Sequence, residues 1–249
     1  MSLPNEREMS FLREHFEGDE LKKAVKRLEN GEPLAYIIGE WYFYGMTFCL
    51  NESCLIPRPD TEHVTEKIIE LLPQNGHFAD LCSGSGCIAL SVLANRKDAT
   101  CLSVELSADA CEMIAKNASL NDVTASEQGK PGKIEILCAD IFELQLEKES
   151  FDIIASNPPY IETAVIPSLE TVKYEPKAAL DGGEDGLKFY RHIINNFAPA
   201  LKENGMFVFE IGYDQAEKIK ELANAGGFEC EITRDYGGND RVAVLKKNE

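Results

Sequence analysis

The chain has 249 residues and a formal net charge of -18, with 43 acidic against 25 basic side chains. This length allows one sizeable domain with a small appendage, and the apolar fraction of 44% is ordinary for a globular protein. No segment approaches the roughly 18 apolar residues of a membrane-spanning helix, and the first residues contain no apolar run of signal-peptide length. The sequence therefore predicts a soluble, cytoplasmic protein without membrane association, and its negative charge disfavours a nucleic-acid partner.

Eight cysteines are spread along the chain without a C-x-x-C pair or a neighbouring histidine at metal-ligand spacing. Most of them lie in apolar runs that are typical of strands or helices. They are predicted to be reduced, buried, structural thiols, and no metal site is expected.

The first part of the chain predicts two helices, a hairpin and a link. One helix is expected around residues 5–16, and a second begins after Asp19, which we interpret as its N-cap. The aromatic, β-favouring run around Gly45 predicts a short hairpin, followed by the proline-stiffened link "LIPRPDTE". Asp60 or Thr61 is expected to cap the next helix.

From there on, strand-like and helix-like segments alternate. Strands are expected at 77–82, 100–106, 133–139, 151–156, 205–211, 228–234 and 241–247, and helices at 86–95, 108–119, 186–202 and 214–225. Such alternation needs crossover helices on both faces of a mostly parallel sheet. The link between the last two strands, "DYGGND", is too short for a crossover, so these strands should pair antiparallel.

The predicted fold is therefore α/β, with a doubly wound, mostly parallel, Rossmann-like sheet of seven strands that ends in an antiparallel hairpin. A small helical N-terminal region is expected at residues 1–40, a β-hairpin and linker at 41–60, and the main domain at 61–249.

The segment "FADLCSGSGCIAL" predicts a nucleoside-binding loop. Gly84 and Gly86 lie between a strand and a helix, where the missing Cβ allows a tight turn and the close approach of a ligand. Glu105 ends the next strand, where a carboxylate can accept hydrogen bonds from both ribose hydroxyls. The loop fits a dinucleotide as well as S-adenosylmethionine (SAM). Asp80 favours SAM, because a carboxylate there balances a cationic ligand and repels a pyrophosphate.

Two more strand ends complete the predicted crevice. Asp140 follows the third strand and is suited to bind an adenine amino group, with Ile141 and Phe142 flanking the ring. The fourth strand delivers Asn157. Ligands of open α/β sheets bind where such strand ends converge.

The stretch "SNPPYIE" follows the fourth strand, and its prolines make the exit from that strand stiff and extended. The side-chain oxygen of Asn157 and the carbonyl of Pro158 can each accept one N–H of a planar NH₂ group, while Tyr160 packs flat against it. Such a nitrogen is a poor nucleophile, so catalysis would rest mainly on positioning. The predicted catalytic residues are therefore Asn157, Pro158 and Tyr160, and Pro159 joins them in substrate binding.

Taken together, these motifs resemble the release factor glutamine methyltransferases, a family of class I SAM-dependent methyltransferases. The resemblance rests on "LIPRPDTE", "DLCSGSGCIAL", "CADIF", "FDIIASNPPYI", "YEPKAALDGGEDGL" and "GGNDRV". It implies that the chain methylates the Gln of the Gly-Gly-Gln motif of a peptide-chain release factor, giving N5-methylglutamine and S-adenosylhomocysteine. It also implies that the N-terminal helical region, which looks short here, docks the release factor.

The resemblance places SAM against Cys82, Ser83, Gly84, Ser85, Gly86, Glu105, Ile141 and Asn157. With Asp80, Leu106 and Asp140 these form the predicted cofactor site, and the "NPPY" residues hold the glutamine. The family usually has glycine in place of Cys82, a mild change if the backbone φ angle there is negative.

Other readings of the same motifs stay open. An adenine amino methyltransferase acting on DNA or RNA would use the same NH₂ geometry. A non-catalytic SAM-binding module and a nicotinamide-dependent dehydrogenase are further alternatives. The segment "YEPKAALDGGEDG" is interpreted either as a lid over the crevice or as an ordinary surface connection.

Overall fold

The computed structural model describes residues 4–126 and 132–248. Its helices are α1 (Glu6–His15), α2 (Gly18–Glu29), α3 (Leu34–Ile38), α4 (Glu62–Leu71), α5 (Cys87–Asn95), α6 (Ala108–Leu120), α7 (Lys188–Phe197) and α8 (Ala216–Ala225). Its strands are β1 (Glu40–Phe43), β2 (Met46–Cys49), β3 (His77–Leu81), β4 (Thr100–Glu105), β5 (Ile134–Cys138), β6 (Phe151–Ser156), β7 (Leu201–Glu210), β8 (Phe228–Arg234) and β9 (Asp240–Lys247). Within the described ranges, no helix is long and apolar enough to cross a membrane.

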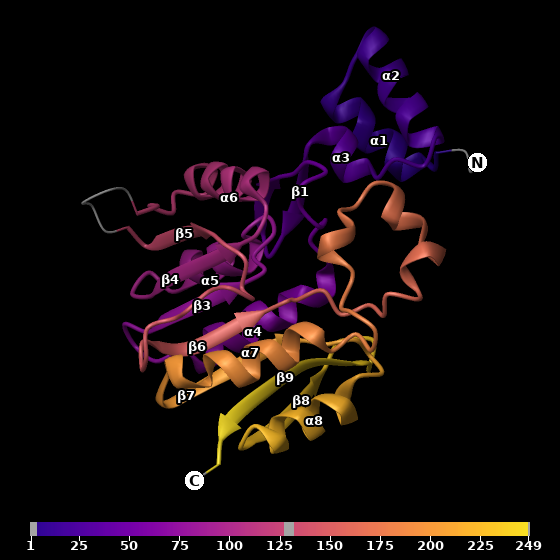
Figure 1. Ribbon diagram of the computed structural model, residues 1–249. Helices are drawn as coiled ribbons and strands as arrows, with labels where there is room; N and C mark the ends of the chain where they lie inside the picture. The colour runs from indigo at the N-terminus through magenta and orange to yellow at the C-terminus, as the bar shows by residue number, and fades with distance from the viewer. Residues whose placement is uncertain (1–3, 127–131, 249) are drawn as a thin grey trace.

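Seven strands form one sheet in the order β5-β4-β3-β6-β7-β9-β8. The strands from β3 to β7 pair in parallel, whereas β9 runs antiparallel to both of its neighbours. The predicted α/β fold with a C-terminal antiparallel hairpin is therefore confirmed (Figure 1). The order also puts the carboxyl ends of β3 to β6 side by side, where the crevice was predicted.

Both faces of this sheet are buried, and successive side chains of a strand point alternately into the two cores. Phe78 belongs to the core that β3 shares with α4, α5 and α6, while its neighbours Ala79 and Leu81 belong to the core under α7 and α8. In β6, Ile153 and Ile154 divide between the two cores in the same way. Because successive strand residues point to opposite faces, a sheet with two buried faces needs such nearly continuous apolar strands.

The N-terminal helices α1, α2 and α3 gather at one end of the molecule, beside the segment that joins β6 to α7 (Figure 1). A small apolar cluster around Leu12, Ala24 and Ile37 holds them together. The hydroxyl of Tyr174, from the β6–α7 segment, donates to the carbonyl of Asn30 at 2.9 Å. The helical region at 1–40 thus touches the main domain near the predicted crevice, and the division into three units stays a prediction.

Three expected boundaries are wrong. Helix α2 begins at Gly18 with Glu17 as its N-cap, so Asp19 lies inside the first turn, where its carboxylate pairs with a lysine one turn later. The helix predicted at 186–202 ends at Phe197, because Pro199 cannot donate a backbone hydrogen bond to continue it. The chain then enters β7 at Leu201, earlier than expected.

All eight cysteines are free thiols, as predicted. Their burial is less uniform than expected. Cys54, Cys87 and Cys101 are buried, but Cys138 is exposed because it is the last residue of the edge strand β5. Apolar strand patterning therefore predicts burial poorly at the end of an edge strand.

Asn117 fastens the β1–β2 hairpin to the main domain. Its side chain is fully buried on α6, accepts a hydrogen bond from the backbone N–H of Cys49 at 2.7 Å, and donates to the carbonyls of Cys49 and Ser85. One carboxamide thus satisfies backbone groups of both the hairpin and the glycine loop.

Replacing Asn117 by Ala leaves these buried backbone groups unpaired, and we expect a loss of about 3 kcal/mol in the free energy of unfolding, measured by urea denaturation. The matched control is Asn121→Ala, one turn later, whose amide donates to the carbonyls of Thr47 and Asn117 in a partly exposed position. We expect a loss below about 1 kcal/mol there. Equal losses for the two variants would contradict the role of Asn117.

Candidate functional site

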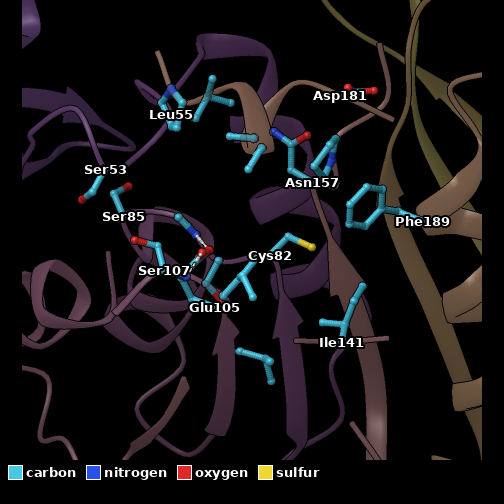
Figure 2. Close-up of a pocket in the computed structure, with 18 of the residues that line it drawn as sticks. Ser53, Leu55, Cys82, Ser85, Glu105, Ser107, Ile141, Asn157, Asp181 and Phe189 are labelled. Carbon is cyan, nitrogen blue, oxygen red and sulfur yellow. Dashed lines mark hydrogen bonds between the residues drawn. The ribbon is translucent and has the colours of Figure 1, made fainter. Parts of the chain in front are cut away.

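A pocket of about 750 Å³ opens at the carboxyl ends of β3, β4, β5 and β6 (Figure 2). Its floor comes from the turns after these strands. One wall comes from the link before α4 and another from the β6–α7 segment. This volume suits a small-molecule ligand with room for a second group.

The structure brings most of the predicted site residues together in this pocket. Its lining includes Cys82, Ser83, Gly84, Ser85, Glu105, Leu106, Asp140, Ile141, Asn157 and Pro159. Four predicted residues lie behind the lining that the described residues form, namely Asp80, Gly86, Pro158 and Tyr160. For these four, a direct contact with a ligand stays a prediction without support from their position.

Glu105 shapes the glycine loop. Its Oε2 accepts a hydrogen bond from the backbone N–H of Gly84 at 2.8 Å, and its Oε1 accepts one from Ser107 at 2.9 Å (dashed lines in Figure 2). A carboxylate has about four acceptor sites, so both oxygens keep lone pairs for hydroxyl groups of a ligand. The carboxylate therefore fixes the loop and still faces the pocket.

Cys82 departs from expectation in its backbone. Its φ angle is +59°, in the left-handed region that costs an L-residue roughly 1–2 kcal/mol and that glycine adopts freely. A thiol at this position is therefore not the mild change that a negative φ angle would make it. Burial raises the pKa of the Cys82 thiol well above its usual range, so it faces the pocket as a neutral group.

The polar lining beside the loop includes an unsatisfied hydroxyl. Ser85 is 2% exposed and lines the pocket, yet its Oγ has no hydrogen-bond partner among the described residues. Helix α5 begins two residues later, so its free backbone N–H groups face the same region. A polar or anionic group of a ligand fits there, which agrees with the carboxylate end of SAM.

Aromatic and apolar groups line the opposite end of the pocket. Asp140 accepts a hydrogen bond from the N–H of Phe142 at 2.9 Å, which fixes the turn after β5. Phe142 meets Phe189 edge to face, with 5.2 Å between ring centroids, and the buried Ile141 also lines the pocket. This arrangement offers an acidic group next to aromatic and apolar side chains, which suits an adenine ring.

Asn157 lines the pocket, and its side chain is drawn above Cys82 in Figure 2. Its Nδ2 donates to the hydroxyl oxygen of Thr61 at 3.2 Å. Its Oδ1 accepts no hydrogen bond from the described residues, so this oxygen remains to serve a ligand in the pocket.

The hydroxyl of Tyr160 points into the protein interior. The predicted role, packing against the substrate, has no support from this position. The hydroxyl donates to Oε1 of Glu210 at 3.3 Å, and the carbonyl of Tyr160 accepts from the amide of Gln215 at 3.0 Å. The ring packs against the core under α7 and α8. The position of Tyr160 therefore favours a structural role, in which its side chain anchors "NPPY" to the core, over packing flat against a substrate.

Glu210 is a buried carboxyl at the end of β7. It is 1% exposed, and burial raises its pKa, while the Thr61 hydroxyl and the positive charge of Arg241 oppose the rise. Arg241 itself pairs with Asp60 at 3.2 Å and with Asp235 at 3.3 Å. The start of α4 is thereby fastened to the C-terminal strands.

The "YEPKAAL" segment is held against the link before α4. Glu175, with a side chain only 1% exposed, accepts two hydrogen bonds of 2.7 Å from the guanidinium of Arg58. It also accepts a bond from the N–H of Ile56. Pro176 and Ala179, directly after this clamp, line the pocket, so the segment forms a wall of the site.

The glycines of "DGGEDG" allow this wall to touch "NPPY". A Cβ built on Gly182 would lie 2.6 Å from the Cα of Tyr160, and one on Gly186 would lie 2.5 Å from the carbonyl oxygen of Tyr160. The N–H of Ile161 donates to the carbonyl of Leu180, and Gly182 donates back to the carbonyl of Ile161. Backbone contacts therefore fix the direction in which "NPPY" leaves β6.

The strand order and the pocket at the carboxyl ends of β3 to β6 define a class I methyltransferase fold. The methyltransferase small domain family matches residues 60–171. A solved methyltransferase from Pyrococcus furiosus shares the fold with a TM-score of 0.61 at 15% identity, over 92% of this chain and 100% of that one.

Two curated relatives are far more similar in sequence. The release factor glutamine methyltransferase of Thermodesulfovibrio yellowstonii is 38% identical over 92% of this chain and 81% of its own length. The enzyme of the same name from Aquifex aeolicus is 36% identical over 90% and 78%. The chain belongs to the family of release factor glutamine methyltransferases.

The sequence predicted Thr61 only as a possible helix cap, and its side chain makes no capping hydrogen bond at the start of α4. It gave no individual role to Glu210, to Arg241 or to the Arg58–Glu175 pair. A signal existed for Glu210, because a carboxylate that ends an apolar strand lies at the ligand edge of such a sheet. Partners so far apart in sequence cannot be paired from spacing alone.

Asp80 carries a pH prediction. Its side chain points to the same face as Phe78, is 0% exposed, and has no hydrogen-bond partner among the described residues. Burial raises its pKa from 3.8 to about 7, so the native state binds more protons than the unfolded state between these values. The stability that this protonation contributes is present below the lower value and is lost as the pH rises to about 7.

Asp80→Asn removes this titration. We expect the unfolding free energy of the variant, relative to the wild type, to increase by a few kcal/mol between about pH 4 and pH 7 and then to stay level. Urea denaturation across this pH range measures the difference. Asp122→Asn, at an exposed position, is the control, and it should show no such trend. A difference for Asp80→Asn that does not depend on pH would contradict the prediction.

Gly182→Ala tests the close approach to "NPPY". The new methyl group must displace the backbone of Tyr160, so we expect a loss of about 1–3 kcal/mol in unfolding free energy together with a large loss of activity. The control is Gly227→Ala, at a φ angle of +82° with nothing within 4 Å of the new Cβ, between α8 and β8. This control should lose stability but keep its activity. Full activity in Gly182→Ala would show that the contact does not position "NPPY".

Proposed function

We propose that this chain transfers a methyl group from SAM to the side-chain amide nitrogen of a glutamine in a protein, the Gln of the Gly-Gly-Gln motif of a peptide-chain release factor. The product would be N5-methylglutamine. The observation that carries the proposal is the Asn157 carboxamide, whose Nδ2 is occupied by Thr61 and whose Oδ1 remains for a ligand in a nucleoside-shaped pocket. Membership of the release factor glutamine methyltransferase family supports it.

The residues present fit SAM. Glu105 offers lone pairs for ribose hydroxyls, Asp140 an acceptor for the adenine amino group, and Ser85 an unpartnered hydroxyl near the start of α5. Asp80 lies buried behind the loop with a pKa raised to about 7, so we assign it no direct contact with SAM. When bound, SAM supplies a reactive methyl group together with its own leaving group.

The task of the protein is to orient the amide nitrogen. An amide nitrogen is a weak nucleophile because its lone pair is delocalised. Oδ1 of Asn157, which lines the pocket, would accept one of the N–H groups of this nitrogen. The carbonyl of Pro158, which lies behind the lining, is the proposed acceptor for the other, and together they would fix the plane of the amide. Neutral hydrogen bonds of this kind contribute only about 1 kcal/mol each, whereas good orientation is worth roughly 7–11 kcal/mol. Rigid placement of the acceptors matters more than their number.

We also propose that the helical region at residues 1–40 docks the protein substrate. Its helices stand beside the β6–α7 wall of the pocket, and Tyr174 joins that wall to Asn30. A cytoplasmic location is proposed because all eight cysteines are free thiols. The charge of -18 makes an adenine in DNA or RNA the less favoured acceptor.

Mass spectrometry of a release factor incubated with the protein and SAM tests the proposal. We expect an increase of about 14 Da, from replacing H by CH₃, on the peptide that holds Gly-Gly-Gln. Asn157→Ala should lower this methyl transfer about 100-fold, because the amide is no longer aimed, and should change SAM affinity only a few-fold.

Asn95→Ala, an exposed position at the end of α5, is the control and should behave as the wild type. Methylation of an oligonucleotide, with none on the release factor, would contradict the proposed acceptor. Full turnover in Asn157→Ala would remove this residue from its role.

A further inference from the structure

The buried hydroxyl of Thr61 has to accept one hydrogen bond and donate another. Thr61 is 2% exposed, its oxygen accepts a hydrogen bond from Nδ2 of Asn157, and its own O–H proton therefore needs a different acceptor. Glu210 is 1% exposed, and its Oε2 has no hydrogen-bond partner among the described residues. Helix α4, which starts next to Thr61, packs against the strand that ends in Glu210.

We propose that Glu210 is a positioning residue that accepts the hydroxyl proton of Thr61 and thereby fixes the Asn157 carboxamide with its oxygen toward the pocket. The inference rests on the proposed function, and it names a residue that never touches the substrate. It also supplies the partner that Oε2 of Glu210 otherwise lacks.

The direction of the hydrogen bonds follows from the ionised form of Glu210. Burial raises the pKa of this carboxyl, but the positive charge of Arg241 and the hydroxyl of Tyr160 oppose the rise. In its ionised form the carboxylate only accepts, so Thr61 donates to it and can then only accept from Asn157. Asn157 must therefore present its NH₂ to Thr61, and its oxygen is left for the substrate. Without the carboxylate, Thr61 is free to donate to Asn157, and the carboxamide can turn over. A turned carboxamide would face the substrate NH₂ with another NH₂.

Two further contacts hold the chain of hydrogen bonds in place. Tyr160 donates to the other oxygen of Glu210 at 3.3 Å, which fixes the carboxylate from the "NPPY" side. Arg241, from β9, pairs with Asp60 at 3.2 Å, and so holds the residue next to Thr61. Segments from four parts of the chain thus meet behind Asn157.

The first experiment compares E210Q with the wild type in release factor methylation. Gln has the shape of Glu but offers an NH₂ donor, so we expect kcat to fall about tenfold or more, as loss of one oriented hydrogen bond in the transition state implies. The KM for SAM should stay within about twofold, since no cofactor contact changes. An unchanged kcat, or a KM that rises while kcat is kept, would overturn the positioning role.

The second experiment uses Thr61 with a matched control on the same helix. T61V removes the hydroxyl at similar volume and should reproduce the loss in E210Q, while T61S should restore most of the rate. The double variant E210Q/T61V should be no slower than the slower single variant, because both act through one chain of hydrogen bonds. Additive losses would indicate separate structural effects and would overturn the inference.

T65V is the control for T61V. Thr65 is 0% exposed on α4, and its hydroxyl has no hydrogen-bond partner among the described residues, so the same substitution tests packing without touching the network. T65V should keep its kcat within about twofold of the wild type. A loss in T65V equal to that in T61V would reduce the role of Thr61 to packing and would overturn the inference.

A readout without turnover separates this inference from the proposed function. In ¹⁵N-labelled protein, the side-chain NH₂ signals of Asn157, assigned by their absence from Asn157→Asp, should shift in both E210Q and T61V. Signals that do not move would overturn the inference even if the wild type methylates a release factor. If the wild type methylates no release factor but the signals shift, the proposed function fails and the positioning network stands.

Discussion

The site depends on the need of every buried polar group around Asn157 for a partner. Thr61 and Glu210 are almost completely buried, and an unmet hydrogen bond at such a place costs about 1–3 kcal/mol. In the proposed network Thr61 and Glu210 satisfy one another, and the groups then hold one another in a single orientation. Oδ1 of Asn157 is the polar atom of this side chain that the network does not use, and its direction in the pocket is set by the network. The side chain at the reacting position is thus rigid because the buried groups around it have few possible hydrogen-bond partners.

The same constraint explains why distant segments carry the family resemblance. "LIPRPDTE" supplies Arg58 for the clamp on Glu175 and Thr61 for the amide, and "GGNDRV" supplies Arg241 for Asp60. "DGGEDG" supplies glycines that let the wall approach "NPPY". Each of these segments looks like an ordinary link or turn when it is read alone. In the fold they meet at the carboxyl end of β6, and each supports the position of "NPPY".

Much of the architecture could be predicted because strand ends in a parallel sheet must meet at one edge. The glycine loop, Glu105, Asp140 and Asn157 were therefore found from the alternation of strands and helices. The direction in which single side chains point could not be predicted in the same way. Asp80 lies under α5, because the strand alternation places it with Phe78. The φ angle of Cys82 depends on local backbone geometry that residue patterns do not determine. The helix end at Phe197 had a sequence signal in Pro199, which the prediction missed.

The hydrogen-bond energies imply that the pocket and the rest of the surface contribute differently, the pocket to orientation and the surface to affinity. Two neutral hydrogen bonds to a glutamine amide contribute about 2 kcal/mol in total, which is far too little to bind a protein substrate. Affinity must then come from surfaces outside the pocket, and the helices α1 to α3, which lie beside the β6–α7 wall, are the docking surface that we propose. The pocket can then select by geometry, since it contributes orientation and little binding energy. The weakly nucleophilic amide can therefore react although the pocket binds the glutamine side chain of the substrate only weakly.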